Sequence, residues 1–60
     1  MEKFKILVDI AERYNTGDDS HWYFAADMTA IAVNEALDLV GLTLDESMTI
    51  TQKIEWLKGL

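Results

Sequence analysis

The sequence predicts an all-α protein, a small three-helix bundle with a short connector helix. Two observations lead to this prediction: apolar residues recur at helical spacing in three segments, and no proline interrupts them. A third is the position of the glycines, because Gly17, Gly41 and Gly59 stand where helices would end. With 60 residues, the chain has room for a single domain, residues 1–60.

The first helix is predicted from about Glu2 to Tyr14. A strand over Phe4–Ile10 is the alternative, because every second residue in that segment is also apolar. Leu7 would lie on the polar face of such a strand, and the following residues 11–13, Ala-Glu-Arg, favour a helix. The apolar residues at helical spacing are Phe4, Leu7, Val8, Ala11 and Tyr14.

Residues 15–20, Asn-Thr-Gly-Asp-Asp-Ser, predict a loop, since these side chains form turns with their own backbone. Asp18, Asp19 or Ser20 is expected to cap the helix that follows, because each can accept a hydrogen bond from a free N–H group. The two carboxylates would also interact favourably with the positive end of that helix.

The second helix is predicted from His21 to Val40, a segment rich in alanine with no helix breaker before Gly41. Its apolar arc is wider than the ~100° of an ordinary surface helix. We therefore expect it to be central and to contact neighbours on two sides. The broad face consists of Trp22, Ala25, Ala26, Thr29, Ala32, Val33, Ala36, Leu37 and Val40.

Two capping patterns follow the second helix. Gly41-Leu42 predicts a Schellman stop, in which the chain folds back on the last helical turn. Residues 43–46, Thr-Leu-Asp-Glu, match a capping box and predict the connector helix over Leu44–Met48. A second box at residues 49–52 predicts the start of the last helix. One face of that helix is formed by Ile50, Ile54 and Leu57.

The stability of so small a chain must come from packing or from association, because it has no cysteine for a disulfide or a thiolate metal site. Half of the residues are hydrophobic, which is enough for a core. The predicted core consists of Phe4, Leu7, Val8, Ala11, Trp22, Ala25, Ala32, Val33, Ala36, Leu37, Val40, Ile50, Ile54 and Leu57.

The charge balance limits the partners. Eleven acidic residues against five basic ones give a net charge of −6, which nucleic acid and anionic membranes would repel. A protein with a basic surface is the partner that such a charge favours. No apolar run approaches the ~18 residues of a membrane span, and the first ten residues lack the pattern of a signal peptide. We therefore expect a cytoplasmic protein.

No catalytic motif is visible, so an enzyme is not expected, and neither is a cofactor. Asp18, Asp19 and His21 are close enough in sequence to suggest a metal site, but they supply too few ligands for a cage. Their simpler interpretation is a helix cap, and no metal is predicted. A helix-turn-helix around Gly41 is disfavoured as well, because the reading helix would present Asp45 and Glu46 to phosphates.

Four consecutive rings, from His21 to Phe24, are the most unusual feature, since they point around the whole helix and cannot all enter one core. Phe24 and Ile31 fall near the polar side, as anchors for a partner or as cover for the third helix. Trp56 poses the same question. The dispersed carboxylates either provide solubility or contact a basic partner. The candidate partner-binding residues are Asp18, Asp19, Trp22, Phe24, Asp27, Ile31, Glu35, Asp38 and Trp56.

The leading functional hypothesis is a small acidic regulator or inhibitor that binds another protein stoichiometrically, such as a basic or nucleic-acid-binding protein. Its size and charge are similar to those of small acidic inhibitors encoded by phages and mobile elements, whose carboxylates imitate phosphates. The first alternative is a self-assembling helical module, in which a homodimer pairs through the wide apolar face of the second helix. The second alternative is a metal-dependent enzyme near Asp18 and His21.

Overall fold

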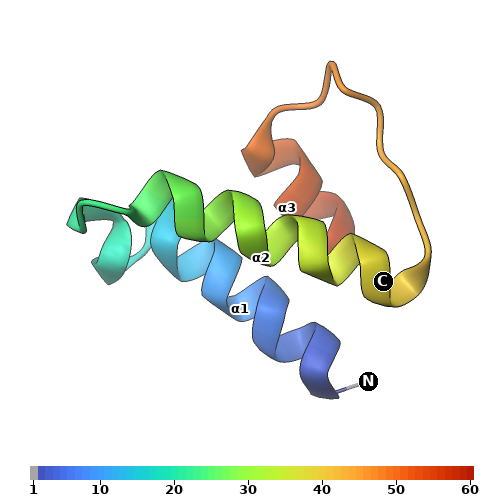
Figure 1. The fold of residues 1–60 in the computed structure, drawn as a ribbon, viewed down its shortest axis with the longest axis horizontal. Coiled ribbons are helices and arrows are strands. Elements are labelled where there is room, and N and C mark those ends of the chain that lie inside the picture. Colours follow the sequence, from blue (N-terminus) through green and yellow to red (C-terminus); the bar gives the residue numbers. More distant parts are fainter. Residues whose placement is uncertain (1) are drawn as a thin grey trace.

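The computed structural model describes residues 2–60 and consists of three α-helices and one short 3-10 helix (Figure 1). The order is α1 (Glu2–Thr16), η1 (Asp18–His21), α2 (Ala25–Val40) and α3 (Ile50–Lys58). Helix α2 lies in front of α1 and α3 in Figure 1 and packs against both. The predicted all-α, three-helix bundle is therefore confirmed.

Helix α1 extends two residues beyond its predicted end, and the alternative of a strand over 4–10 is wrong. Val8 and Ala11 are buried, in agreement with the helical spacing of the apolar residues. The helix ends at Gly17, whose N–H donates to the carbonyl of Arg13 at 3.0 Å. A Cβ atom at Gly17 would lie 3.0 Å from the Arg13 backbone, so this close approach favours glycine.

The predicted start of the second helix is wrong, because α2 begins at Ala25 and not at His21. Residues 18–21 form η1, and Trp22 then has an extended backbone, with φ −66° and ψ 146°. Trp22 therefore lies in the turn between two helices and is 62% exposed, although it was predicted in the core. Phe24 occupies the N-cap of α2 without a side-chain hydrogen bond, so Asp18, Asp19 and Ser20 do not cap this helix.

The inner face of α2 is made of small residues that allow its neighbours to approach closely. Val33 and Ala36 are completely buried, and the Thr29 hydroxyl donates to the carbonyl of Ala25 at 2.8 Å. Partly buried Phe4, Leu7, Ile10, Leu44 and Ile50 pack around this core. The buried cluster itself consists of Val8, Ala11, Ala32, Val33, Ala36, Leu37, Ile54 and Leu57.

The C-terminus of α2 has the predicted Schellman geometry. Gly41 is left-handed, with φ 70°, and its N–H donates to the carbonyl of Asp38. The N–H of Leu42 reaches back to the carbonyl of Leu37 at 3.1 Å, which completes the motif. The chain therefore leaves α2 at a defined angle and crosses to α3 in the long loop that Figure 1 shows in yellow and orange.

The predicted connector helix over 44–48 is absent, and a turn takes its place. The Asp45 carboxylate accepts a hydrogen bond from the Ser47 N–H at 2.8 Å, and the Met48 N–H donates to the Asp45 carbonyl. This local side-chain bond competes with helix formation, as aspartate commonly does. The capping pattern of residues 43–46 therefore has no helix to cap.

The second capping box is confirmed at the start of α3. The Thr49 hydroxyl accepts from the Gln52 N–H, and the Gln52 side chain accepts from the Thr49 N–H. Ile54 and Leu57 are buried, so α3 contributes the predicted apolar face. Its N-terminal boundary is therefore defined by these two reciprocal bonds.

Replacing Gly41 with Ala should lower the free energy of unfolding by about 1 kcal/mol, because alanine is strained at positive φ. No atom lies within 4 Å of the added Cβ, so the effect would come from the backbone alone. Gly59→Ala is the matched control, since Gly59 has φ −77°. Urea denaturation of both variants measures the difference, and equal stabilities would contradict the assigned conformation.

Replacing Val33 with Asp should unfold the chain, since an unpaired charge would be buried at a residue that is 0% exposed. The neighbouring Asn34→Asp places a carboxylate on the exposed face of the same helix and should leave the fold intact. Far-ultraviolet circular dichroism distinguishes the two outcomes. A helical Val33→Asp variant would show that the inner face of α2 is misplaced.

Candidate protein-binding site

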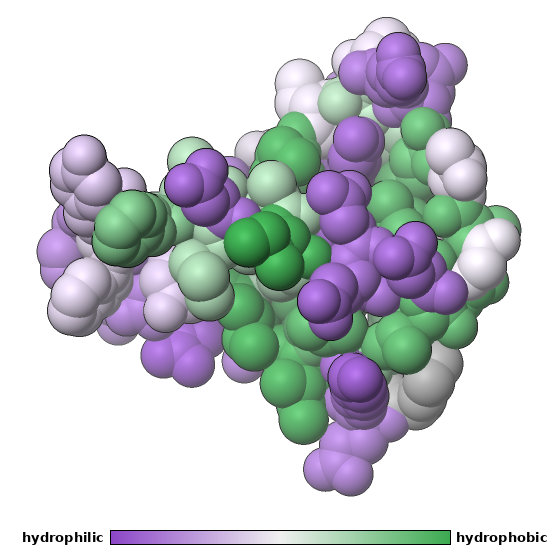
Figure 2. Space-filling view, viewed as in Figure 1, coloured by the Kyte–Doolittle hydropathy of each residue, from purple (hydrophilic) through white to green (hydrophobic). Residues whose placement is uncertain are grey.

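The face of α2 opposite the core carries large apolar side chains in solvent. Met28 and Ile31 on α2 and Phe24 at its N-cap are all exposed, and their spacing of four and three residues aligns them along the helix. We call these three residues the apolar row. Figure 2 shows hydrophobic surface over the middle of α2, on the face turned away from α1 and α3. Packing within the chain therefore leaves this row uncovered.

Three carboxylates share the outward face with the apolar row. Asp27, Glu35 and Asp38 are exposed, and their helical spacing places them on the same side as Ile31. In Figure 2, hydrophilic surface borders the hydrophobic patch on the side of the C-terminal end of α2. Asp27 thus lies beside the apolar row in the first half of the face, and Glu35 and Asp38 make the second half acidic.

The carboxylates of α2 have no cationic neighbour within the described chain. The ion pairs of residues 2–60 join Arg13 to Asp19, and Lys58 to Glu12 and Glu55. The segment Trp22–Gln52 contains no lysine, arginine or histidine, so α2 and the loop after it are purely acidic. Most of the net negative charge of the protein is therefore concentrated on this segment.

The remaining acidic candidates lie at the N-terminal side of α2, in η1. Asp18 is exposed, whereas Asp19 is half-buried and forms an ion pair with Arg13 at 3.0 Å. That ion pair ties η1 to the end of α1 and partly neutralises Asp19. The carboxylate of Asp18 therefore remains exposed, whereas that of Asp19 mainly stabilises the contact between η1 and α1.

The four consecutive rings form an exposed corner beside the apolar row. His21 stacks on Trp22 with ring centroids 6.0 Å apart, and Tyr23 meets Phe24 edge to face at 4.9 Å. Tyr23 is 91% exposed, although it was not among the predicted partner-binding residues. The sequence signal for the exposure of Tyr23 was the run of four rings itself, because a turn that holds all four must leave some of them in solvent.

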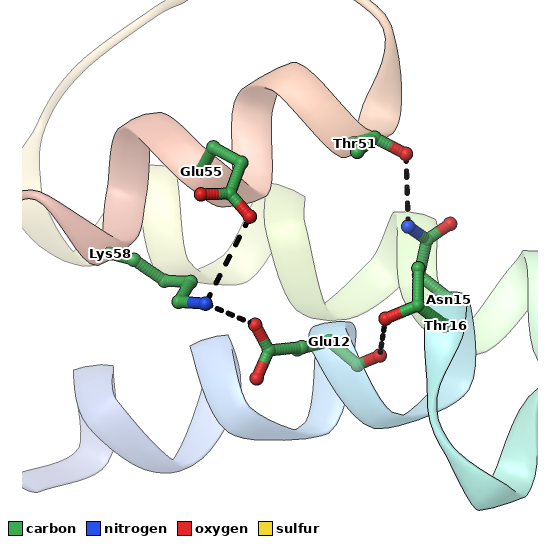
Figure 3. A network of polar contacts seen from close by, with 6 residues as sticks. All are labelled: Glu12, Asn15, Thr16, Thr51, Glu55 and Lys58. Carbon is green, nitrogen blue, oxygen red and sulfur yellow. Dashed lines mark hydrogen bonds and ion pairs between the residues drawn. The ribbon is translucent and has the colours of Figure 1, made fainter.

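Trp56 is exposed and lies on α3, not on α2. Thr51 and Lys58 of α3 face α1 (Figure 3), and helical spacing places Trp56 on another side of α3. The structure therefore brings Phe24, Asp27, Ile31, Glu35 and Asp38 together on one helix face and leaves Trp56 outside it.

Sequence reasoning missed a hollow of about 500 Å³ between α1, the end of α2 and the end of α3. Finding it required the positions of helices that are distant in sequence. Its charged rim contains two lysines and two carboxylates, so it favours neither sign of charge. The lining residues are Phe4, Lys5, Val8, Asp9, Glu12, Val40, Leu57, Lys58 and Leu60.

Polar contacts hold α3 against α1 beside this hollow (Figure 3). The Asn15 amide donates to the Thr51 hydroxyl at 3.1 Å, and Lys58 forms a hydrogen-bonded ion pair with Glu12. The hydrogen bond and charge of Glu12, followed by the charge of Glu55, raise the pKa of Lys58. These contacts serve the fold, because each partner already has its counterpart within the chain.

Among residues 2–60, no three His, Cys, Asp or Glu side chains are grouped closely enough to hold a metal ion. None of the helices over the same residues is long and apolar enough to cross a membrane. His21 is exposed and stacked on Trp22.

Comparison of the chain with known protein families, with characterised proteins and with solved structures finds no match. The outward face of α2 is the candidate site, because apolar and charged groups converge there without internal partners.

Replacing Lys58 with Gln should destabilise the chain near neutral pH, because the ion pair with Glu12 is lost. A raised pKa means that the lysine stabilises the fold below its ordinary value of 10.5, and this contribution is lost as the pH rises through the raised value. The difference in thermal midpoint between wild type and variant should therefore shrink above about pH 10.5. Lys53→Gln is the control, and a difference independent of pH would contradict the ion pair.

Proposed function

We propose that this protein is a small acidic regulator or inhibitor that acts by stoichiometric contact with another protein. The observation that carries the proposal is the outward face of α2, where the apolar row lies beside Asp27, Glu35 and Asp38. Exposed aromatic and aliphatic side chains on one face are typical of interfaces. The carboxylates favour a partner with a basic surface.

The two parts of the face would contribute differently to binding. Phe24 and Ile31 would be buried on association, and a fully buried side chain of this size stabilises a complex by roughly 1.5–3 kcal/mol. The carboxylates would mainly accelerate association and select the partner, because exposed charges contribute less to affinity. Affinity is therefore expected to depend on the apolar row, and the association rate on the charge.

A basic partner includes the class of nucleic-acid-binding proteins. Carboxylates along α2 would occupy positions in a basic groove that phosphates otherwise fill, which is the mode expected of a small acidic inhibitor. Direct binding of nucleic acid or of an anionic membrane is disfavoured by the same charge. We also propose a cytoplasmic location, which is consistent with this role.

Replacing Ile31 with Ser should reduce capture of the partner from a lysate of the source cells at least about tenfold, because an anchor of the interface is lost. Ile6→Ser is the matched control, since Ile6 on α1 is 53% exposed and Ile31 is 54% exposed. Quantitative mass spectrometry of the captured proteins gives the comparison.

The two substitutions differ in place and not in chemistry, so a general loss of hydrophobicity would affect both equally. Equal capture by the two variants, or no captured protein at low salt, would contradict the proposal. Circular dichroism of each variant serves as the check that the fold is retained.

A further inference from the structure

We infer that the partner presents an amphipathic basic helix, which docks lengthwise on α2 with its apolar residues on the apolar row and its lysines or arginines on Glu35 and Asp38. This inference rests on the proposed function and specifies the chemistry of the partner. The inference specifies that the bound segment is a helix and in which order its apolar and basic residues follow one another.

The shape follows from the spacing of the outward face. Phe24, Met28, Ile31, Glu35 and Asp38 are separated by four, three, four and three residues. Alternate spacings of four and three residues are those by which one helix contacts another along its length in a coiled coil. We call these five residues the seam. The seam is about 21 Å long, at a rise of 1.5 Å per residue. A partner strand is disfavoured, since residues 2–60 contain no sheet whose edge it could extend.

The charge order follows from the two halves of the seam. The acidic half, Glu35 and Asp38, lies toward the C-terminus of α2, where the helix dipole is negative, and the last turn contains no basic residue. Carboxylates at this end lower the stability of the helix by itself. A cation from outside the chain would relieve that repulsion, so lysine or arginine is the complement at this half.

A second copy of the chain is a poor complement for the seam. Parallel pairing of two α2 helices would place Glu35 and Asp38 against the same residues of the other copy. Antiparallel pairing about Ile31 would place Asp38 against Phe24 and Glu35 against Met28. The first arrangement brings like charges together and the second removes charges from water without a partner. The seam therefore favours a different, basic helix.

The test uses two synthetic helical peptides of about 18 residues, labelled with fluorescein. Both carry leucines at heptad positions in one half, and the other half carries lysines in one peptide and glutamates in the other. Fluorescence anisotropy measures binding to the wild-type chain and to the double variant Glu35→Lys, Asp38→Lys. The control variant Glu2→Lys, Glu46→Lys changes the net charge equally at exposed positions outside the seam.

The lysine peptide should bind the wild type, and its dissociation constant should rise at least tenfold with the seam variant but less than threefold with the control. The glutamate peptide should bind the seam variant at least tenfold more tightly than the wild type. Equal losses with both variants would overturn the inference, as would a lysine peptide that does not bind. A wild-type chain that sediments as a dimer through the seam would also overturn it.

The outcome separates this inference from the proposed function. If Ile31→Ser abolishes capture of a partner while both peptides fail to bind, the protein-binding function stands and the helical mode is wrong. If capture is also insensitive to Ile31, both proposals fail.

Discussion

The packing of α2 by one face is the constraint on which the rest of the structure depends. Its small inner residues, with Val33 and Ala36 fully buried, allow α1 and α3 to approach from the same side. Residues 2–60 form no further helix that packs over the opposite side. The same packing that makes the core therefore leaves Phe24, Met28 and Ile31 in solvent, on the face that we propose for binding.

The segregation of charge reinforces this division. Arg13, Lys58 and their acidic partners stabilise the contacts of α1 with η1 and α3, whereas α2 has no basic residue of its own. The ion pairs within residues 2–60 thus join α1 to η1 and to α3. The carboxylates of α2 are exposed to solvent and take part in none of them. Salt should weaken both effects, because the carboxylates of α2 are exposed and the ion pairs are only partly buried.

Much of the fold could be predicted from the sequence, because its signals are local. Each correctly predicted feature depends on neighbours within one or two helical turns. These features are the periodicity of α1, the inner face of α2, the left-handed Gly41 and the capping box at Thr49. The errors occurred where local signals competed. Asp45 formed a turn with Ser47 in place of the connector helix, and a break after His21 placed Trp22 outside the core.

The candidate site was predicted in part for the same reason. Ile31 and the carboxylates lie on α2 and Phe24 is its N-cap, so helical spacing was enough to group them. Trp56 belongs to another helix, and the hollow beside Lys58 is formed by segments far apart in sequence. Such relations depend on the packing of the helices, which the sequence pattern does not define.

The central claim is that α2 has an inner face for folding and an outer face for binding. Methyl NMR spectra of the chain, recorded as its captured partner is added, test this claim most directly. We expect the methyl signals of Met28 and Ile31 to shift, while those of Val33 and Leu57 remain in place. Shifts confined to Val8, Val40 and Leu60, around the hollow between α1 and α3, would contradict it.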